Sequence, residues 1–311
     1  MAQKKKKRSA SFDYTIYLVV RFVVCILQML TWSQARAFAH VLAWIAYKVD
    51  KRHRLVAIEN LEHAFPGQYT LTERDQMVRN VYRHFCTLLT EIVLIPRKFH
   101  VTNRQQHVTP VNPERLVQGI LSDRPLLLIT CHFGNWELAG YFLGLCGITI
   151  YSIARTLDNP YLDQFLRKFR QNTGQVMLAK KGDYDKINEV LASGSALATL
   201  GDQNAGRKGA FVDFFGRPAS THKAVALMAI EYNVPMMVSG TMKVGEPCRY
   251  QIICDDWIDP EEYKNHPNPV EAITQRFTAA IERLAKQAPE QYFWLHNRWK
   301  EKPPQTRKRA A

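Results

Sequence analysis

The sequence lacks several short patterns that identify common kinds of site. It contains no P-loop, no His-Glu-x2-His zinc helix and no glycine-rich dinucleotide fingerprint. It also has no internal repeat and no helix-turn-helix, zinc-finger or RNA-recognition signature. These absences give no reason to expect a metal, a bound cofactor or a nucleic-acid partner.

Cysteines are few and scattered. None of the six forms a Cys-x2-Cys pair, and most lie in apolar runs, so we expect reduced core residues in a cytosol-facing protein. Cys131 directly precedes His132, which leaves a Cys-His nucleophile as an alternative. Neighbouring positions in a strand point to opposite faces, and this argues against that alternative.

Acidic residues are outnumbered by basic ones. The chain has 28 Asp and Glu against 42 Lys and Arg, which gives a net charge of +14. Much of the excess lies in residues 1–8 and 300–311, at the two ends of the chain. Basic ends near apolar segments suit an anionic membrane surface.

Residues 14–32 form a mostly apolar run of the length needed to span a membrane, although Arg21 and Gln28 interrupt it. A buried core helix is the alternative. A signal peptide is disfavoured because no small-x-small cleavage site follows. We predict a basic tail at 1–13, a membrane-anchoring helix or hairpin at 14–49, a catalytic domain at 50–300 and a basic tail at 301–311.

The pattern of apolar residues in the rest of the chain alternates between strand and helix. We expect strands at 126–129, 147–154, 196–200, 234–240 and 250–254. We expect helices at 72–94, 165–174 and 273–284, two of which have apolar residues at helical spacing. Such alternation is typical of an α/β fold.

The most informative stretch is TCHFGNWE at residues 130–137. It places His132 at the end of a buried strand, where catalytic groups are usually found. A histidine can take a proton from an alcohol, and a carboxylate such as Glu137 on the other ring nitrogen would fix its tautomer. No serine accompanies the pair, so we expect the substrate's own hydroxyl to attack an acyl group. The alternative is a loop histidine followed by a helix-capping acid.

HFGNWE, at residues 132–137, resembles the His-x4-acid motif of the glycerolipid acyltransferase superfamily. More narrowly, it resembles the bacterial lipid A biosynthesis acyltransferases, the late lauroyl or myristoyl transferases. Four further blocks support the resemblance, in the same order: an Asn-Leu segment near residue 60, RTLDNPYL at 155–162, Asp-Gln at 202–203 with the phenylalanine-rich stretch after it, and PEQYFWLHNRWK at 289–300. The resemblance covers about residues 50 to 300.

The resemblance implies an α/β fold with a central, mostly parallel or mixed sheet flanked by helices, preceded by an N-terminal hydrophobic membrane-anchoring helix. It implies that His132 is the general base and that Glu137 orients it. The substrate-binding residues that it implies are Arg155, Asn159, Asp202, Gln203 and Arg298.

Some of these roles stay open. Arg155 is the candidate for binding phosphate or developing negative charge, and backbone N–H groups near the motif are the other candidates for holding an oxyanion. Asp202 follows a strand and could orient a basic residue or hold an acceptor hydroxyl. Phe211, Phe214 and Phe215 could be core aromatics or could line an acyl channel.

The implied enzyme moves an acyl chain from an acyl carrier protein or coenzyme A thioester to a hydroxyl of a glycolipid, such as a lipid A precursor. It needs no cofactor or metal. We expect it at the bacterial inner membrane, in contact with anionic lipids and with its catalytic domain facing the cytoplasm. The alternatives are another glycolipid or lysophospholipid as acceptor, a thioesterase that uses the same pair, and a non-catalytic membrane-binding protein.

Overall fold

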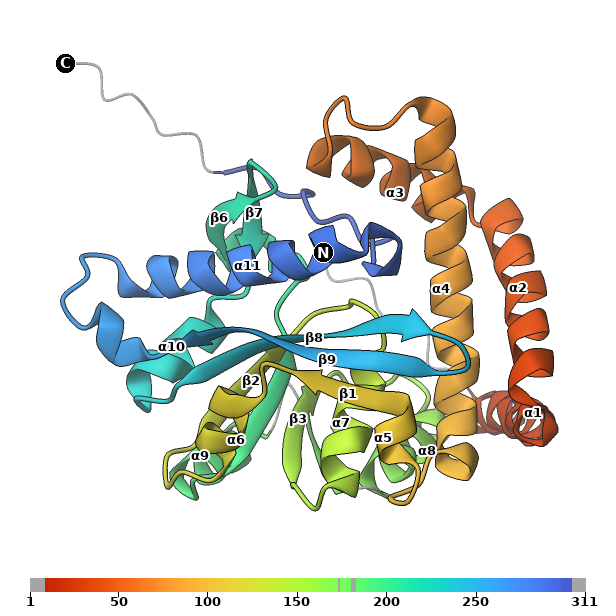
Figure 1. Ribbon diagram of the computed structural model, residues 1–311, viewed down its shortest axis with the longest axis horizontal. Coiled ribbons are helices and arrows are strands. Elements are labelled where there is room, and N and C mark those ends of the chain that lie inside the picture. Colours follow the sequence, from red (N-terminus) through yellow and green to blue (C-terminus); the bar gives the residue numbers. More distant parts are fainter. Residues whose placement is uncertain (1–8, 173, 180–182, 304–311) are drawn as a thin grey trace.

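A seven-stranded sheet forms the centre of the molecule, which is a computed structural model that describes residues 9–172, 174–179 and 183–303. Most of the two predicted basic tails, residues 1–8 and 304–311, lies outside the described residues. The strand order is β1-β9-β8-β2-β5-β3-β4, and every neighbouring pair is parallel except β8 and β9. The predicted α/β class with a mostly parallel sheet is therefore confirmed (Figure 1). The strands are β1 (Val108–Val111), β2 (Leu126–Thr130), β3 (Ile150–Ala154), β4 (Gln175–Ala179), β5 (Ala196–Leu200), β8 (Met236–Gly245) and β9 (Arg249–Ile258).

Helices cover both faces of the sheet, as parallel strands require. Successive side chains of β2 point to opposite faces of the sheet and pack against different helices. Leu127 and Ile129 belong to the core that includes α9, α10 and α11, whereas Leu126 and Leu128 pack with residues of α6 and α7. The helices of these layers are α6 (Glu114–Ile120), α7 (Trp136–Leu145), α8 (Pro160–Gln171), α9 (Tyr184–Ala192), α10 (Ala224–Glu231) and α11 (Pro269–Gln287), and a short α5 (Arg104–His107) precedes β1.

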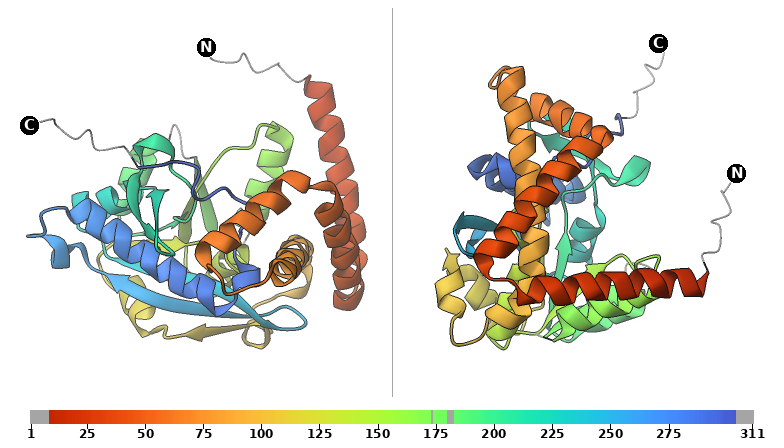
Figure 2. Two further views of the ribbon diagram at one scale, coloured as in Figure 1. Left: turned by 90° about the horizontal axis from the view of Figure 1, so that it is seen from above. Right: turned by 90° about the vertical axis from the view of Figure 1, so that its right-hand side faces the viewer.

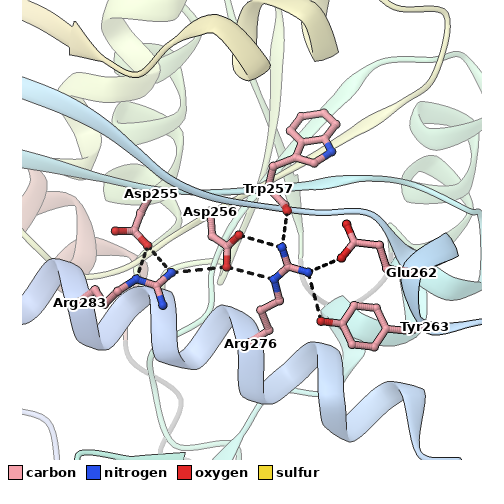
Figure 3. Close-up of polar contacts among 7 residues, drawn as sticks. All are labelled: Asp255, Asp256, Trp257, Glu262, Tyr263, Arg276 and Arg283. Atoms are coloured by element: carbon pink, nitrogen blue, oxygen red, sulfur yellow. Dashed lines mark hydrogen bonds and ion pairs between the residues drawn. The ribbon is translucent and has the colours of Figure 1, made fainter. Parts of the chain in front are cut away.

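Ion pairs fasten α11 to β9 (Figure 3). Arg276 donates to both oxygens of Asp256, at 3.1 and 3.2 Å, and Arg283 donates to Asp255. Arg276 also contacts Glu262 and Tyr263 in the 3-10 turn η2 (Pro260–Tyr263). Each guanidinium has its acid in place, so this cluster holds the outer helix to the sheet.

Four helices precede the sheet: α1 (Ala10–Met29), α2 (Trp32–Val49), α3 (Lys51–Ala64) and α4 (Leu71–Lys98). The apolar run predicted at 14–32 is not one helix, because α1 ends at Met29 and Thr31 caps α2 with a capping box to Gln34. The two helices meet at a steep angle, and α2 packs along α4 (Figure 2). Within the described part of the chain, only α1 is long and apolar enough to cross a membrane, and little of it is buried.

A two-stranded hairpin, β6 (Ala210–Phe214) and β7 (Arg217–Thr221), lies beside α11. Phe214 and Phe215 at its turn are buried against the aromatic residues of the closing segment, Tyr292, Trp294 and Trp299. Of the two roles left open for these phenylalanines, they are core residues here. Two further 3-10 turns are η1 (Gly206–Lys208) and η3 (Pro289–Gln291).

Candidate active site

The register of two central strands brings His132 and Asp202 together. β2 and β5 are parallel neighbours with Thr130 opposite Leu200, and each of the two side chains lies two residues beyond that pair. The Asp202 carboxylate accepts two hydrogen bonds from His132, at 2.8 Å from ring Nδ1 and at 2.9 Å from the backbone N–H. A charged acceptor at Nδ1 fixes the tautomer that leaves Nε2 able to accept a proton.

The orientation of His132 by Glu137, which the His-x4-Glu spacing predicted, is wrong. Glu137 lies in the first turn of α7, and Arg170 of α8 binds its carboxylate through two guanidinium nitrogens, with Nε at 2.8 Å. The helix directs this side chain toward α8 instead of back to the loop. Glu137 is not the capping residue either, since Asn135 accepts from the backbone N–H of Leu138.

The His132 ring is largely enclosed. Its side chain is 19% exposed and that of Asp202 is 3% exposed. Aromatic rings pack on it, with centroid distances of 4.9 Å to Trp136 and 5.8 Å to Phe293. The amide Nε2 of Gln203 lies 3.4 Å from His132 Nε2, so this predicted residue borders the basic nitrogen.

Burial and charge act in opposite directions on this pair. Burial alone would lower the pKa of His132, but the charge and hydrogen bond of Asp202, helped by Glu137, outweigh it and raise the pKa. Burial would raise the pKa of Asp202, yet the charge of His132 and its two hydrogen bonds keep the pKa below the usual range. The acid therefore stays ionised and stabilises a protonated imidazole.

The loop that carries His132 is fixed by its own backbone. Phe133 N–H donates to Cys131 at 2.7 Å, Gly134 N–H to Gln291 at 3.0 Å and Asn135 N–H to Thr241 at 2.9 Å. With the His132 N–H on Asp202, all four backbone donors from 132 to 135 are engaged, so they are not poised to hold an oxyanion. Gly134 has φ +56°, and a Cβ there would lie 1.6 Å from the Thr241 carbonyl oxygen, which excludes any larger residue.

Two of the other predicted site residues, Arg155 and Asn159, make their contacts elsewhere in the fold. Arg155 follows β3 with a side chain that is 78% exposed, 3.5 Å from Asp158. Asn159 is buried as the N-cap of α8, and its amide donates to the Asp13 carbonyl of α1. The resemblance implied that Arg155 and Asn159 bind substrate. In the fold, Arg155 lies on the surface beside Asp158, and Asn159 caps α8.

Arg298 is buried in the closing segment and donates to the Ser220 carbonyl at 2.6 Å and to the Thr221 hydroxyl at 2.5 Å. Its guanidinium also lies over the Phe214 ring, 5.2 Å from the centroid. These contacts anchor the closing segment to β7. The structure thus assembles His132, Asp202 and Gln203, and Arg298 lines a small cavity with Asp202 and Gln203. In the described ranges, the hydrogen bonds and ion pairs of Arg155 and Asn159 go to residues other than these.

Cys131 is completely buried, and burial raises the pKa of its thiol well above the usual range. A thiol in that state is protonated and out of reach of solvent. The alternative of a Cys-His nucleophile therefore has no support, as the alternation of strand positions indicated.

An apolar pocket lies between α7 and the sheet and encloses about 100 Å³. It opens beside the site, because Trp136 and Thr130 line it and Trp136 also packs on His132. The Glu137–Arg170 ion pair contributes the charged part of its wall. Its apolar lining comes from Leu128, Ala139, Leu143, Ile150, Met177, Ala198 and Leu200.

Sequence reasoning missed two residues that support the site. Arg170 carries no prediction of its own, yet its side chain is mostly buried against Glu137. Asn60 donates to the carbonyls of Trp294 and His296, both at 2.7 Å, and so holds the closing segment beside His132. No local spacing could reveal either contact, although the Asn60 block did match the family pattern.

The fold and the site are those of an α/β enzyme with a histidine–carboxylate pair beside an apolar pocket. No group of three or more His, Cys, Asp or Glu side chains suited to a metal ion occurs in the described ranges. The family model of the bacterial lipid A biosynthesis acyltransferases matches residues 1–301, and the chain belongs to that family. It is an O-acyltransferase of the lipid A biosynthesis type.

Relatives of known name agree with this assignment. The chain is 26% identical to the lipid A biosynthesis palmitoleoyltransferase of Escherichia coli (strain K12), over 81% of this chain and 80% of that protein. It is also 26% identical to the lipid A biosynthesis lauroyltransferase of the same organism, over 84% of each. A phosphatidylinositol mannoside acyltransferase of Mycobacterium tuberculosis is 25% identical over 39% of this chain and 40% of that protein.

Proposed function

We propose that this chain moves a fatty acyl group from an acyl carrier protein or coenzyme A thioester to a hydroxyl of a lipid A precursor. One observation carries the proposal. Asp202 holds Nδ1 of His132, so that Nε2 is the free basic nitrogen, and the same ring packs on Trp136 at the apolar pocket. A base for an alcohol thus lies next to a space suited to an acyl chain.

In the proposed reaction, Nε2 of His132 takes the proton of the acceptor hydroxyl while that oxygen attacks the thioester carbonyl carbon. Asp202 stabilises the imidazolium that forms. The tetrahedral intermediate then collapses, the carbon–sulfur bond breaks, and the leaving thiolate takes the proton back from the imidazolium. Atoms and charges balance without an acyl-enzyme.

Gln203 is our candidate for the oxyanion donor. The backbone N–H groups of residues 132–135 are already used, and Arg155 is an exposed side chain 3.5 Å from Asp158, so neither sequence-based candidate fits. The Gln203 amide lies 3.4 Å from His132 Nε2, within reach of an oxygen bound between them. A substrate would replace this long contact with shorter ones.

The apolar pocket is our proposed site for the acyl chain. Its aliphatic lining would remove methylene groups from water, and each buried methylene contributes about 0.8 kcal/mol. The Glu137–Arg170 pair in its wall would keep α7 and α8 together around the chain. In this role Glu137 acts on the pocket and, through its charge, on His132.

We also propose that α1 holds the enzyme at the inner membrane with the site on the cytoplasmic side. Its exposed side chains are mostly large and apolar, among them Val19, Phe22, Ile26 and Met29. The basic stretch at residues 4–8 precedes the helix in the sequence and would meet anionic lipids.

The test uses membranes that contain this chain, labelled acyl carrier protein thioester, and one of three acceptors: a lipid A precursor, a phosphatidylinositol mannoside or a lysophospholipid. Mass spectrometry should show one added acyl group on the lipid A precursor. Acylation of another acceptor alone would refute the proposed acceptor. Free fatty acid without any acylated lipid would instead favour a thioesterase.

A further inference from the structure

A polar groove borders the site and shares no residue with the apolar pocket. It has a volume of about 500 Å³ and lies between α3, the loop after β5 and the closing segment. Its charged and polar lining includes Arg52, His53, Asn204, His296, Lys300 and Glu301. The groove is therefore open enough to receive a hydrophilic group.

The groove reaches almost to the catalytic base. Asn204, in its wall, follows Gln203, whose amide lies 3.4 Å from His132 Nε2. The backbone N–H of Asn204 donates to His296 Nε2 at 3.0 Å, which joins two walls of the groove. A ligand in the groove would thus lie beside the residue pair that receives the attacking hydroxyl.

The charge in the groove favours an anion. Arg52 and Lys300 have no acidic partner in the described part of the chain, whereas the neighbouring Arg54 donates to the Tyr47 carbonyl. The one acid in the lining, Glu301, lies 3.9 Å from Arg207. The lining therefore carries Arg52 and Lys300 against the single carboxylate of Glu301, which leaves it net positive.

His296 adds a neutral donor. Its Nε2 accepts a hydrogen bond, and burial, together with the charges of Arg298, His132 and Lys300, lowers its pKa despite the opposing charge of Asp202. The neutral ring then carries its proton on Nδ1. A guanidinium, an ammonium and an imidazole N–H form a donor set that suits phosphate oxygens.

We propose that this groove binds a phosphate group of the substrate through Arg52 and Lys300, and that this contact holds the acceptor lipid in the site beside His132. The proposal rests on the proposed function, because it names what that site recognises. The favoured source is the headgroup of a phosphorylated glycolipid, since the apolar pocket is assigned to the donor's acyl chain. The phosphate of a donor's pantetheine arm is the other source.

The test compares the double variant Arg52→Gln/Lys300→Gln with a matched control, Arg115→Gln/Lys264→Gln. The control removes the same charge from α6 and from the turn after η2, outside the groove, and Figure 1 shows α6 far from α3. With a phosphorylated lipid A precursor, the groove variant should raise the acceptor KM about tenfold or more and leave kcat almost unchanged. The control should match the wild type.

Two further arms identify the source of the phosphate. The same precursor after phosphatase treatment should bind the wild type and the groove variant equally. Donors are compared as a phosphopantetheine thioester and as a pantetheine thioester without phosphate. If the groove substitutions raise the KM of the phosphopantetheine thioester but not that of the pantetheine thioester, the groove is a phosphate site and the donor supplies the phosphate. The proposal would be overturned if the groove substitutions raised KM equally for substrates with and without phosphate, for donor and acceptor alike. It would also be overturned if the groove variant had the same KM as the control variant.

Binding without turnover separates this proposal from the proposed function. The precursor and its dephosphorylated form are titrated into the His132→Ala chain, with and without the two groove substitutions. Tighter binding of the phosphorylated form that disappears in the groove variant supports the phosphate site even if the wild type transfers no acyl group. Equal binding of the two precursor forms, together with equal binding of the phosphopantetheine and pantetheine thioesters, overturns it whatever the activity.

Discussion

Replacing Asp202 with asparagine should move the proton of His132 to the wrong ring nitrogen. The carboxylate accepts from the backbone N–H with one oxygen and from Nδ1 with the other. Asparagine has a single acceptor oxygen. If it serves the backbone N–H, its NH2 group faces Nδ1, which must then accept, and the proton moves to Nε2. The base is lost while the shape of the side chain is kept.

The rate should therefore fall by about 10²- to 10⁴-fold, the usual contribution of a general base. A second effect distinguishes this cause from a damaged fold. In the wild type, Asp202 raises the pKa of His132, so activity should rise with pH through a value above 6.5. Without the carboxylate, burial dominates and lowers that pKa, so the rising limb of the residual activity should move to lower pH.

The measurement is kcat/KM for the lipid A precursor as a function of pH, in the wild type, Asp202→Asn and the control Asp185→Asn. Asp185 is exposed on α9, and its replacement should change neither the rate nor the profile. An Asp202→Asn enzyme with full activity and an unshifted profile would refute the proposed role of Asp202.

Three other predictions concern the surroundings of the site. Glu137→Gln should lower both melting temperature and transfer, because it removes the mostly buried carboxylate that Arg170 binds, at a cost of about 1–3 kcal/mol; calorimetry and the acyl assay check this. Ala198→Leu should shift preference toward shorter acyl chains by narrowing the apolar pocket, as competing thioesters of different length would show. Val19→Glu with Phe22→Glu should release the chain from vesicles in a flotation assay without lowering its melting temperature, since both side chains are exposed.

Each of these predictions has an outcome that contradicts it. An unchanged melting temperature and rate for Glu137→Gln would reduce its ion pair to a surface contact. Unaltered chain preference in Ala198→Leu would move the acyl site elsewhere. Full retention on vesicles after the two α1 substitutions would show that α1 is not the anchor.

The sequence predicted the inner strands of the sheet but not its edges. β2 is buried on both faces and reads as an uninterrupted apolar run. β1 and β4 are the two edge strands, and neither was predicted. β1 contains Pro110, which an edge strand tolerates, so its composition is that of a loop. Only Val108 of β1 is fully buried, which leaves too weak a pattern to recognise, whereas β4 is short although Met177 and Leu178 are both buried.

Two kinds of site residue could be predicted from the sequence: those that lie close together in the chain and those that directly follow a strand. His132 and Asp202 were both singled out, and an orienting role was one of two options for Asp202. The choice of Glu137 as the partner of His132 failed because spacing along a chain does not show which way a helix directs its side chains. The register of β2 and β5 decides the pairing, and only the fold supplies it.

Chemical rescue of His132→Ala tests the central claim most directly. The variant should lose acyl transfer by about 10²- to 10⁴-fold while it keeps the wild-type melting temperature and membrane association. Added imidazole should restore part of the transfer to the lipid A precursor, because it supplies the missing base in the space left by the ring. Full activity of the variant without imidazole would contradict the assignment of His132 as the general base.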